Sequence, residues 1–172
     1  MEIRQERSAD YEAVYQVVKE AFAHAEHTDG HEQDLVVDLR KSKAFIPELS
    51  LVAVEDDKVV GHILFTKAVV NQTAVLALAP LSVLPEYQGK GIGLSLVKQG
   101  HKIAAEWGYR YSIVLGHPKF YPKAGYIPAS RYGIKAPFPV KDENFMAICL
   151  CGNGEQLNGV MEYDEAFGIE PS

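Results

Sequence analysis

The sequence contains little cysteine: only Cys149 and Cys151 are present. On an alternating strand these two side chains would point to the same face, too close along the chain for an ordinary disulfide bridge. A lone Cys-x-Cys pair without partner ligands is also a weak indication of a metal site. We therefore expect two free thiols in a reducing cytosol, which excludes a disulfide-stapled scaffold.

Long apolar runs and excess positive charge are also missing. No run approaches the roughly 20 residues of a membrane span, and the opening MEIRQERSAD has no apolar core of a secretory signal. Lysine and arginine number 17 against 23 acidic residues, a net charge of −6. A nucleic-acid partner requires a basic patch. We expect a cytoplasmic protein with neither a membrane nor a nucleic-acid partner.

The 172 residues, 47% of them hydrophobic, suffice for one complete core. No internal repeat, low-complexity segment or linker interrupts them. The sequence predicts a single domain over 1–172, with its core in about 1–151 and a C-terminal strand and tail in 152–172.

Periodicity predicts alternating strands and helices, with Ser8 as the N-cap of the first helix. Strands are expected at 2–5, 51–55, 59–66, 111–115, 145–151 and 159–163, with a further pair within 68–84 turning at Asn71-Gln72. Helices are expected at 9–22, 31–41 and 93–106. Strands dominate early and a crossover helix joins two later strands, which predicts a mixed sheet with helices packed on it.

The segment Leu81–Gly93, LSVLPEYQGKGIG, carries the most information. An apolar strand ends at Pro85, glycines follow at alternating positions, and a helix begins. A strand, a glycine turn and a helix N-terminus together present free N–H groups at the positive end of a helix dipole. This arrangement predicts a phosphate site, although an ordinary glycine-rich turn would have the same composition.

The glycine spacing fits neither of two familiar phosphate motifs. Leu94 stands where a dinucleotide fingerprint needs its third glycine, and Gly91 follows Lys90 where a Walker loop needs Ser or Thr. The pattern is instead Gln88-x-x-Gly91-x-Gly93. It resembles the pyrophosphate-binding motif of the GNAT superfamily of acyl-CoA-dependent N-acetyltransferases.

Two further segments support this resemblance. Residues 111–126, YSIVLGHPKFYPKAGY, resemble the family's next strand, which ends at a glycine before a short helix with a tyrosine and a Gly-aromatic pair. Residues 44–65 resemble the hairpin before the CoA strand. The similarity covers nearly the whole chain and is strongest to the small bacterial, YhbS-type predicted acetyltransferases. It implies an α/β (α+β) fold with a mixed, splayed central sheet of six to seven strands flanked by helices.

The resemblance implies acetyl-CoA as cosubstrate. Main-chain groups of Leu81, Ser82 and Val83 would meet the pantetheine and the acyl carbonyl if the sheet splays there. The pyrophosphate would be held by Gln88, Gly89, Lys90, Gly91, Ile92 and Gly93. Lys90 is equally well explained as a solvated surface lysine.

Tyr121 is the expected general acid, because a phenol with a pKa near ~10 stays protonated and can protonate a departing thiolate. Members of the family often place a tyrosine here for that purpose; core packing is the alternative. His117 follows a strand end and its ordinary pKa of ~6.5 suits a base. Since relatives more often have an acidic residue there, a capping or substrate-contact role for His117 is equally compatible, and ordered water can replace a dedicated base.

A polar segment follows the first helix. It consists of His24, Glu26, His27, Asp29, His31 and Glu32. Leu35 stands where a His-Glu-x-x-His zinc motif needs its second histidine, so no metal is expected. In the family this connection borders the acceptor pocket, and Asp29 and Glu32 are the candidates for binding a cationic amine. His62 and His101 are expected to be structural.

These features predict an N-acetyltransferase that moves an acetyl group from acetyl-CoA to a primary amine of a small molecule, peptide or protein, by direct attack in a ternary complex. A homodimer is possible. Two alternatives remain from other classes: a CoA-binding regulatory module without turnover, and a metal-dependent hydrolase.

Overall fold

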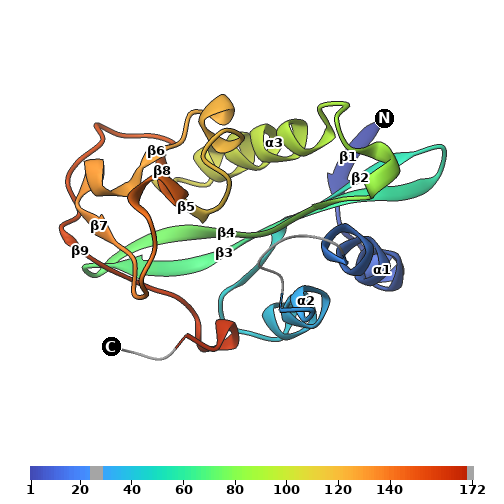
Figure 1. Cartoon of the computed structure of the whole chain (residues 1–172), viewed down its shortest axis with the longest axis horizontal. Coiled ribbons are helices and arrows are strands. Elements are labelled where there is room, and N and C mark those ends of the chain that lie inside the picture. Colours follow the sequence, from blue (N-terminus) through green and yellow to red (C-terminus); the bar gives the residue numbers. More distant parts are fainter. Residues whose placement is uncertain (24–28, 170–172) are drawn as a thin grey trace.

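A long, twisted sheet with helices on both faces forms the molecule (Figure 1), and the computed structural model describes residues 1–23 and 29–169. The strands are β1 (Glu2–Gln5), β2 (Phe45–Glu55), β3 (Lys58–Val70), β4 (Thr73–Val83), β5 (Tyr111–Leu115), β6 (Ile127–Pro128), β7 (Ile134–Lys135), β8 (Phe145–Cys149) and β9 (Gly159–Glu162). The α-helices are α1 (Tyr11–Phe22), α2 (Glu32–Arg40) and α3 (Ile92–Glu106). Short 3₁₀ turns include η1 (Ser8–Asp10), η2 (Pro85–Tyr87), η3 (Tyr121–Ala124), η4 (Ala129–Tyr132), η5 (Asp142–Asn144) and η6 (Glu165–Phe167).

The strand order is β1-β2-β3-β4-β5-β8-β6, with β9 on the far end of β3 and β7 on β9. Neighbours are antiparallel except for β4 with β5 and β7 with β9. A parallel pair needs a crossover connection, which α3 supplies between β4 and β5. The mixed α/β fold class predicted from the sequence is confirmed.

The described chain has nine strands in this sheet, so the expected number of six to seven was too low. The two extra short strands, β6 and β7, contain two residues each. Segments this short show no alternation of apolar and polar residues, because the pattern needs about four residues to emerge.

The hairpin that precedes the glycine loop is longer than expected. The 13 residues of β3 run without a break through Lys67, where the sequence suggested an interruption. The expected strand pair within 68–84 is therefore the end of β3 with β4, and its turn at Asn71 and Gln72 is confirmed by their positive φ of 46° and 68°. β2 begins at Phe45 rather than Leu51, because a register shift between Phe45 and Ser50 admits Pro47 at an exposed position.

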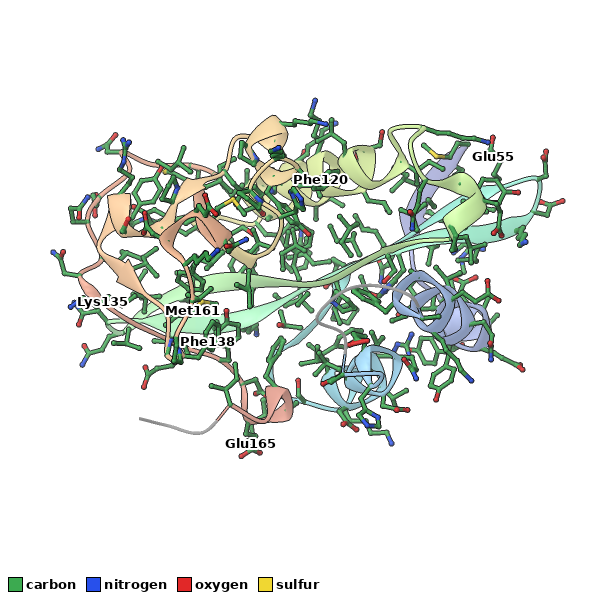
Figure 2. The ribbon with its side chains drawn as sticks, in the orientation of Figure 1. Glu55, Phe120, Lys135, Phe138, Met161 and Glu165 are labelled. Atoms are coloured by element: carbon green, nitrogen blue, oxygen red, sulfur yellow. The ribbon has the colours of Figure 1, made fainter. Side chains whose placement is uncertain are left out.

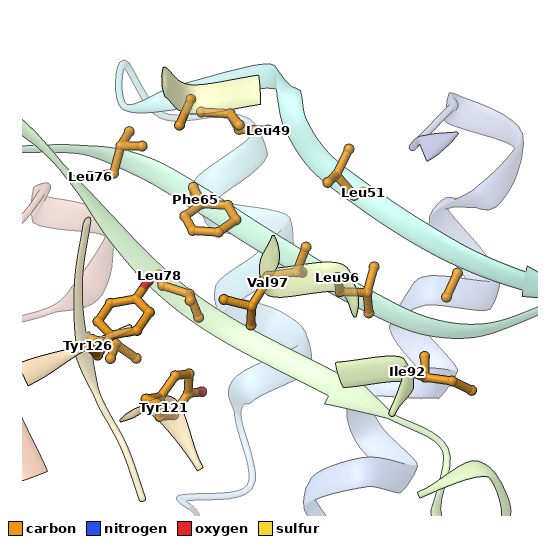
Figure 3. Close-up of a cluster of buried hydrophobic side chains, with 14 of the residues drawn as sticks. Leu49, Leu51, Phe65, Leu76, Leu78, Ile92, Leu96, Val97, Tyr121 and Tyr126 are labelled. Carbon is orange, nitrogen blue, oxygen red and sulfur yellow. The ribbon is translucent and has the colours of Figure 1, made fainter. Parts of the chain in front are cut away.

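Two helical layers cover the sheet. α3 packs on one face, and α1 with α2 on the other (Figure 1). The α3 core gathers buried side chains of the helix and of the strands beneath it, among them Leu51, Phe65, Leu78 and Leu96 (Figure 3). An apolar stripe recurring every three to four residues explains why α3 lies flat on the sheet.

The start of α1 differs from the prediction. Ser8 opens the turn η1, and Asp10 is the N-cap residue of α1, without a side-chain cap hydrogen bond. The Asp10 carboxylate instead accepts hydrogen bonds from the Arg7 N–H at 2.8 Å and from the Arg4 guanidinium at 2.8 and 3.0 Å. This ion pair ties β1 to the beginning of the helix.

A second hydrophobic core includes Ile113 of β5, Phe145 of β8 and Met161 of β9. In Figure 2 Phe138 lies on the opposite side of β3 and β4 from Phe120. η6 contacts α2, so that the C-terminal segment and the second helix close over the same face.

The cysteines lie at the end of β8 rather than within one strand. Cys149 is the last residue of β8, and Cys151 follows in a bend, so the expected shared face of a strand was wrong. Both are free thiols, and their Sγ atoms approach the main-chain oxygens of Cys151 and Tyr109 at 3.3 Å. The bend arises because pairing of β8 with β5 ends at Tyr111.

None of the described helices has both the length and the apolar character needed to cross a bilayer.

Candidate active site

The glycine loop between η2 and α3 is built by left-handed backbone. Gly89 has φ 77° and Gly91 has φ 83°, and both would leave a Cβ in open space. These conformations suit glycine because a Cβ would meet its own backbone. Gly91 is the N-cap of α3, so the chain turns sharply from the end of β4 into the helix.

The turn leaves a continuous row of main-chain N–H groups without acceptors. Within the described chain, none of the N–H groups from Gly89 through Leu94 donates to a protein atom. The first paired group is the Ser95 N–H, which donates to the Gly91 carbonyl at 3.0 Å. Free N–H groups at the positive end of a helix of 15 residues make an anion site. Compared with the predicted Gln88–Gly93 segment, the row gains Leu94 and loses Gln88, whose main-chain N–H donates to the Pro85 carbonyl at 3.2 Å.

Gln88 and Lys90 help to shape this loop. The Gln88 amide donates to the Val83 carbonyl at 3.0 Å, which ties the loop to the end of β4. The Lys90 ammonium is exposed and lies 5.2 Å from the ring centre of Tyr87. The lysine is thus held beside the free N–H groups, where it can screen an anion.

The sheet opens next to this loop. β4 pairs with β5 only at Leu76↔Ser112 and Ala77↔Ile113, and beyond Ala77 the described part of β5 no longer accompanies it. On its other edge, β4 stays paired with β3 as far as Val83. A bulge interrupts this ladder, since the register shifts between Ile63 and Phe65. The splay implied by the sequence is present.

The register shows which main-chain groups face the open edge. Leu84 donates to the Val60 carbonyl at 2.9 Å, so this opposed pair is hydrogen-bonded. Bonded and non-bonded pairs alternate in an antiparallel ladder. Ser82, opposite His62, is therefore bonded to β3, whereas the main-chain groups of Leu81 and Val83 point away from β3. Of the three predicted residues, Leu81 and Val83 direct their main-chain groups to the open edge, and Ser82 directs its own toward β3.

Tyr121 stands at the start of η3, after the end of β5. Its ring lies against Gly116, where an added Cβ would come within 2.2 Å of the ring, and it meets the rings of Phe120 and Tyr126 edge to face at 4.9 and 5.6 Å. Burial raises the pKa of its phenol well above the ordinary value. Its hydroxyl has no hydrogen-bond partner among the described residues.

The neighbouring Tyr126 differs in this respect. Its hydroxyl contacts the Ser112 hydroxyl at 2.8 Å and His101 Nε2 at 2.9 Å (Figure 3 shows its position beside Tyr121). Burial lowers the pKa of His101 to about 4. Tyr126 is thus engaged in a structural network, and Tyr121 is the tyrosine with an available proton.

Gly93 is the point at which the separate parts of the site meet. A Cβ at this position would lie 3.4 Å from the Phe120 ring, 3.7 Å from Leu81 and 3.8 Å from Val83. The glycine loop, the open edge of β4 and the residue before Tyr121 are therefore in contact. Gly116, the glycine at which the predicted strand 111–115 ends, leaves the room that the Tyr121 ring occupies.

His117 is exposed, and its Nδ1 accepts the Lys119 N–H at 3.1 Å. In the neutral ring this bond puts the proton on Nε2, leaving no lone pair for a base. The geometry favours the capping role over the catalytic one among the alternatives left open by the sequence.

Asp29 and Glu32 lie on a cavity of about 320 Å³ at the start of α2. The His31 N–H donates to Asp29 at 2.8 Å and lowers the pKa of that carboxyl. Three of the predicted polar residues, His24, Glu26 and His27, lie outside the described residues. The cavity wall consists of Asp29, His31, Glu32, Asp34, Leu35, Asp38, Ala166 and Phe167.

Sequence comparison establishes the family. The profile described as "Acetyltransferase (GNAT) family" matches residues 9–126, more than half of the chain. The chain belongs to the acetyltransferase (GNAT) family. Both the resemblance and the predicted enzyme class, an acyltransferase, are confirmed at this level.

Two relatives come from Escherichia coli strain K12. The uncharacterized N-acetyltransferase YjhQ is 41% identical over 118 residues, which cover 66% of this chain and 65% of YjhQ, just under two thirds of its length. The uncharacterized N-acetyltransferase YhbS is 31% identical over 140 residues, covering 79% of this chain and 83% of YhbS.

Solved structures share the whole architecture. YhbS from Escherichia coli in complex with CoA has a TM-score of 0.88 at 27% identity, covering 97% of this chain and 91% of that one. A GNAT family acetyltransferase from Brucella melitensis in complex with acetyl-CoA has a TM-score of 0.81 at 30% identity, covering 96% and 97%.

Proposed function

We propose that this chain transfers an acetyl group from acetyl-CoA to a primary amine of a small molecule or a peptide, by direct attack within a ternary complex. The observation that carries the proposal is the row of unpaired N–H groups from Gly89 through Leu94 beside the open edge of β4. Two structural neighbours of the chain hold CoA or acetyl-CoA. The residues of this site suit the same cosubstrate.

Each part of the site has a distinct task in this proposal. The N–H row and Lys90 bind the pyrophosphate, an interaction of charge with free donors at a helix start. The N–H groups of Leu81 and Val83 hold the pantetheine and polarise the acyl carbonyl as it gains negative charge. The amine attacks the carbonyl carbon and loses its proton to water, because the lone pair of His117, on Nδ1, is engaged by the Lys119 N–H.

Tyr121 supplies the proton for the departing sulfur. As the tetrahedral intermediate collapses, the C–S bond breaks and the phenolic proton passes to the thiolate, leaving free CoA. Burial raises the pKa of the phenol, and the same dry surroundings raise the basicity of a thiolate formed beside it. Solvent then restores the phenol.

The acceptor is proposed to be a cationic amine that approaches along the acidic cavity at α2. Asp29 and Glu32 line this cavity with two further carboxylates, and Phe167 of η6 borders it. Carboxylates attract an ammonium group and raise its local concentration beside α2.

Calorimetry with CoA and a thiol-release assay with acetyl-CoA and a panel of amines test the proposal. We expect binding of CoA and release of thiol that depends on a polyamine, an aminoalkyl compound or a peptide amine. Binding without release for any amine would indicate a regulatory module, and absence of binding would overturn the proposed function.

A further inference from the structure

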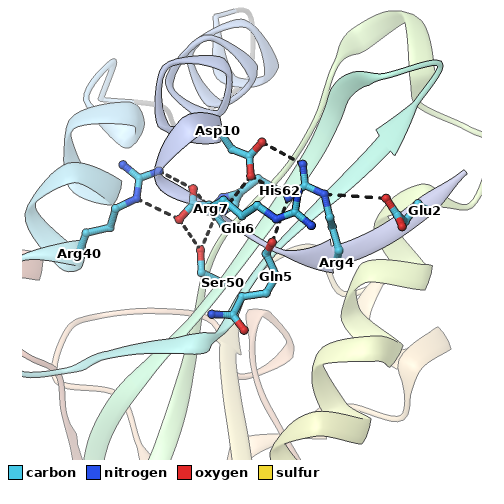
Figure 4. Close-up of polar contacts among 9 residues, drawn as sticks. All are labelled: Glu2, Arg4, Gln5, Glu6, Arg7, Asp10, Arg40, Ser50 and His62. Atoms are coloured by element: carbon cyan, nitrogen blue, oxygen red, sulfur yellow. Dashed lines mark hydrogen bonds and ion pairs between the residues drawn. The ribbon is translucent and has the colours of Figure 1, made fainter.

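A buried polar network lies beneath β3 on the α1/α2 face (Figure 4). The Glu6 carboxylate accepts two hydrogen bonds from Arg40, at 3.1 and 2.6 Å, and a third from the Ser50 hydroxyl at 2.9 Å. The Glu6 side chain is 1% exposed and that of Arg40 10%. The network therefore joins Glu6, the residue after β1, to α2 and β2 with little contact with water.

This network determines which nitrogen of His62 carries the proton. His62 Nε2 lies 3.0 Å from the Ser50 hydroxyl oxygen. Because Ser50 gives its single proton to Glu6, it must accept at this contact, so Nε2 of His62 is the donor. Burial lowers the pKa of His62 to about 4, although Glu6 opposes this shift. The ring is thus neutral, with a lone pair on Nδ1.

That lone pair has no partner, and neither has the hydroxyl opposite. His62 Nδ1 and Ser82 Oγ are both buried without a hydrogen bond. His62 and Ser82 are directly opposed in the β3–β4 register, and opposed side chains lie on the same face of a sheet. Nδ1 needs a donor and the serine hydroxyl is one, so the two groups are complementary.

The position of Ser82 on β4 affects the orientation of the neighbouring main-chain N–H groups. It lies between Leu81 and Val83, whose main-chain groups face the open edge of β4. A hydrogen bond that holds the Ser82 side chain therefore also controls how these N–H groups are aimed. An N–H donor that is misplaced by about 1 Å loses much of its stabilising effect on a reacting carbonyl.

We infer that His62 and Ser82 are positioning residues for acyl transfer. The two side chains make no direct hydrogen bond, so one buried water that accepts from the Ser82 hydroxyl and donates to Nδ1 of His62 orients the main chain of Leu81 and Val83 toward the acyl carbonyl. The Glu6–Arg40 pair anchors His62 through Ser50. The inference rests on the proposed function, since it concerns the same site.

Ser82→Ala separates this role from a purely structural one. Removing the hydroxyl takes one partner from the bridging water, so we expect the thermal midpoint to fall by only about 2–4 °C. We nevertheless expect kcat to fall about tenfold, with KM for acetyl-CoA and the calorimetric Kd for CoA within twofold of the parent. A purely structural serine would leave kcat unchanged.

Thr66→Val is the matched control. Thr66 Oγ1 is also buried without a partner on β3, but Ala77 opposite it has no polar side chain. We expect no change in kcat for this variant. Ser82→Thr keeps the hydroxyl and should recover at least half of the parental kcat.

A double-mutant cycle tests the pairing itself. His62→Gln retains a donor for Ser50 but places no acceptor at the Nδ1 position, so it should lose kcat as Ser82→Ala does. The double variant should be no worse than the poorer single variant, because both remove one interaction. Parental kcat in Ser82→Ala, or additive losses in the double variant, overturns the inference. A parent without CoA binding or thiol release overturns the proposed function instead.

Discussion

At the scale of single residues, the two neighbouring tyrosines differ in the hydrogen-bond partners of their hydroxyl groups. Tyr121 and Tyr126 are both buried, with rings 5.6 Å apart. Tyr126 has two hydrogen-bond partners for its hydroxyl, and Tyr121 has none within the described chain. The proposed acid is thus the tyrosine whose proton serves no structural bond.

Tyr121→Phe is expected to lower kcat about 100-fold or more, the range for loss of a general acid. KM for acetyl-CoA and the stability should change little, because no partner is left unsatisfied. Steady-state thiol release with the preferred amine measures the effect.

Tyr126→Phe serves as its control. It leaves Ser112 and His101 with unpaired polar atoms, so it should destabilise the fold by about 1–3 kcal/mol while retaining most of the turnover. An unchanged kcat in Tyr121→Phe would show that another group protonates the thiolate.

At the scale of elements, the glycine loop depends on left-handed backbone. Gly91→Ala places a Cβ at φ 83° and is expected to cost about 1–2 kcal/mol. Since the strain twists the free N–H groups, CoA affinity should fall about tenfold. Calorimetry with CoA and thermal unfolding measure the two effects.

Gly108 offers a matched control at the other end of α3. It has φ 84°, and a Cβ there also meets open space. Gly108→Ala should lose similar stability and keep parental CoA affinity. Equal weakening of CoA binding in both variants would attribute the effect to global strain.

α3 approaches the sheet most closely at Gly100. A Cβ there would lie 2.2 Å from the ring of Phe65, which is fully buried. Gly100→Ala is therefore expected to destabilise the fold by about 1–3 kcal/mol in urea unfolding, despite the better helix propensity of alanine. Phe65→Leu should restore part of the loss in the double variant; a more stable single variant contradicts this packing.

Periodicity located the three helices to within about two residues, because each helix shows its apolar stripe over several turns. It missed β6, β7 and the early start of β2. β6 is defined by its pairing with β8, β7 by its pairing with β9, and the start of β2 by its pairing with β3. A local sequence pattern does not indicate pairing with a distant segment.

At the scale of the whole molecule, the buried His62 and the half-buried His101 make stability depend on pH. The folded-state pKa values of His62 and His101 are both lowered to about 4, mainly by burial. Their unfolded value is about 6.5. Between these limits the unfolded chain binds more protons, so stability is complete above pH 6.5 and falls as the pH decreases toward 4.

The expected slope is about 1.4 kcal/mol per pH unit for each histidine. Urea unfolding between pH 7.5 and 4.5 measures it, and His101→Gln should reduce the slope by about half. Asp10, whose pKa is lowered by Arg4, contributes only at lower pH. A flat profile above pH 4.5 would contradict the burial of both rings.

The sequence by itself determined the glycine loop and the helix that follows, because left-handed turns, caps and apolar stripes are encoded within a few neighbouring residues. It also placed Tyr121 as a candidate acid. Only the tertiary structure decided which N–H groups of β4 face the gap, which tyrosine keeps a free hydroxyl, and that His62 meets Ser50 and Glu6. Those properties depend on strand register and on contacts between distant segments, which exist only after the chain has packed.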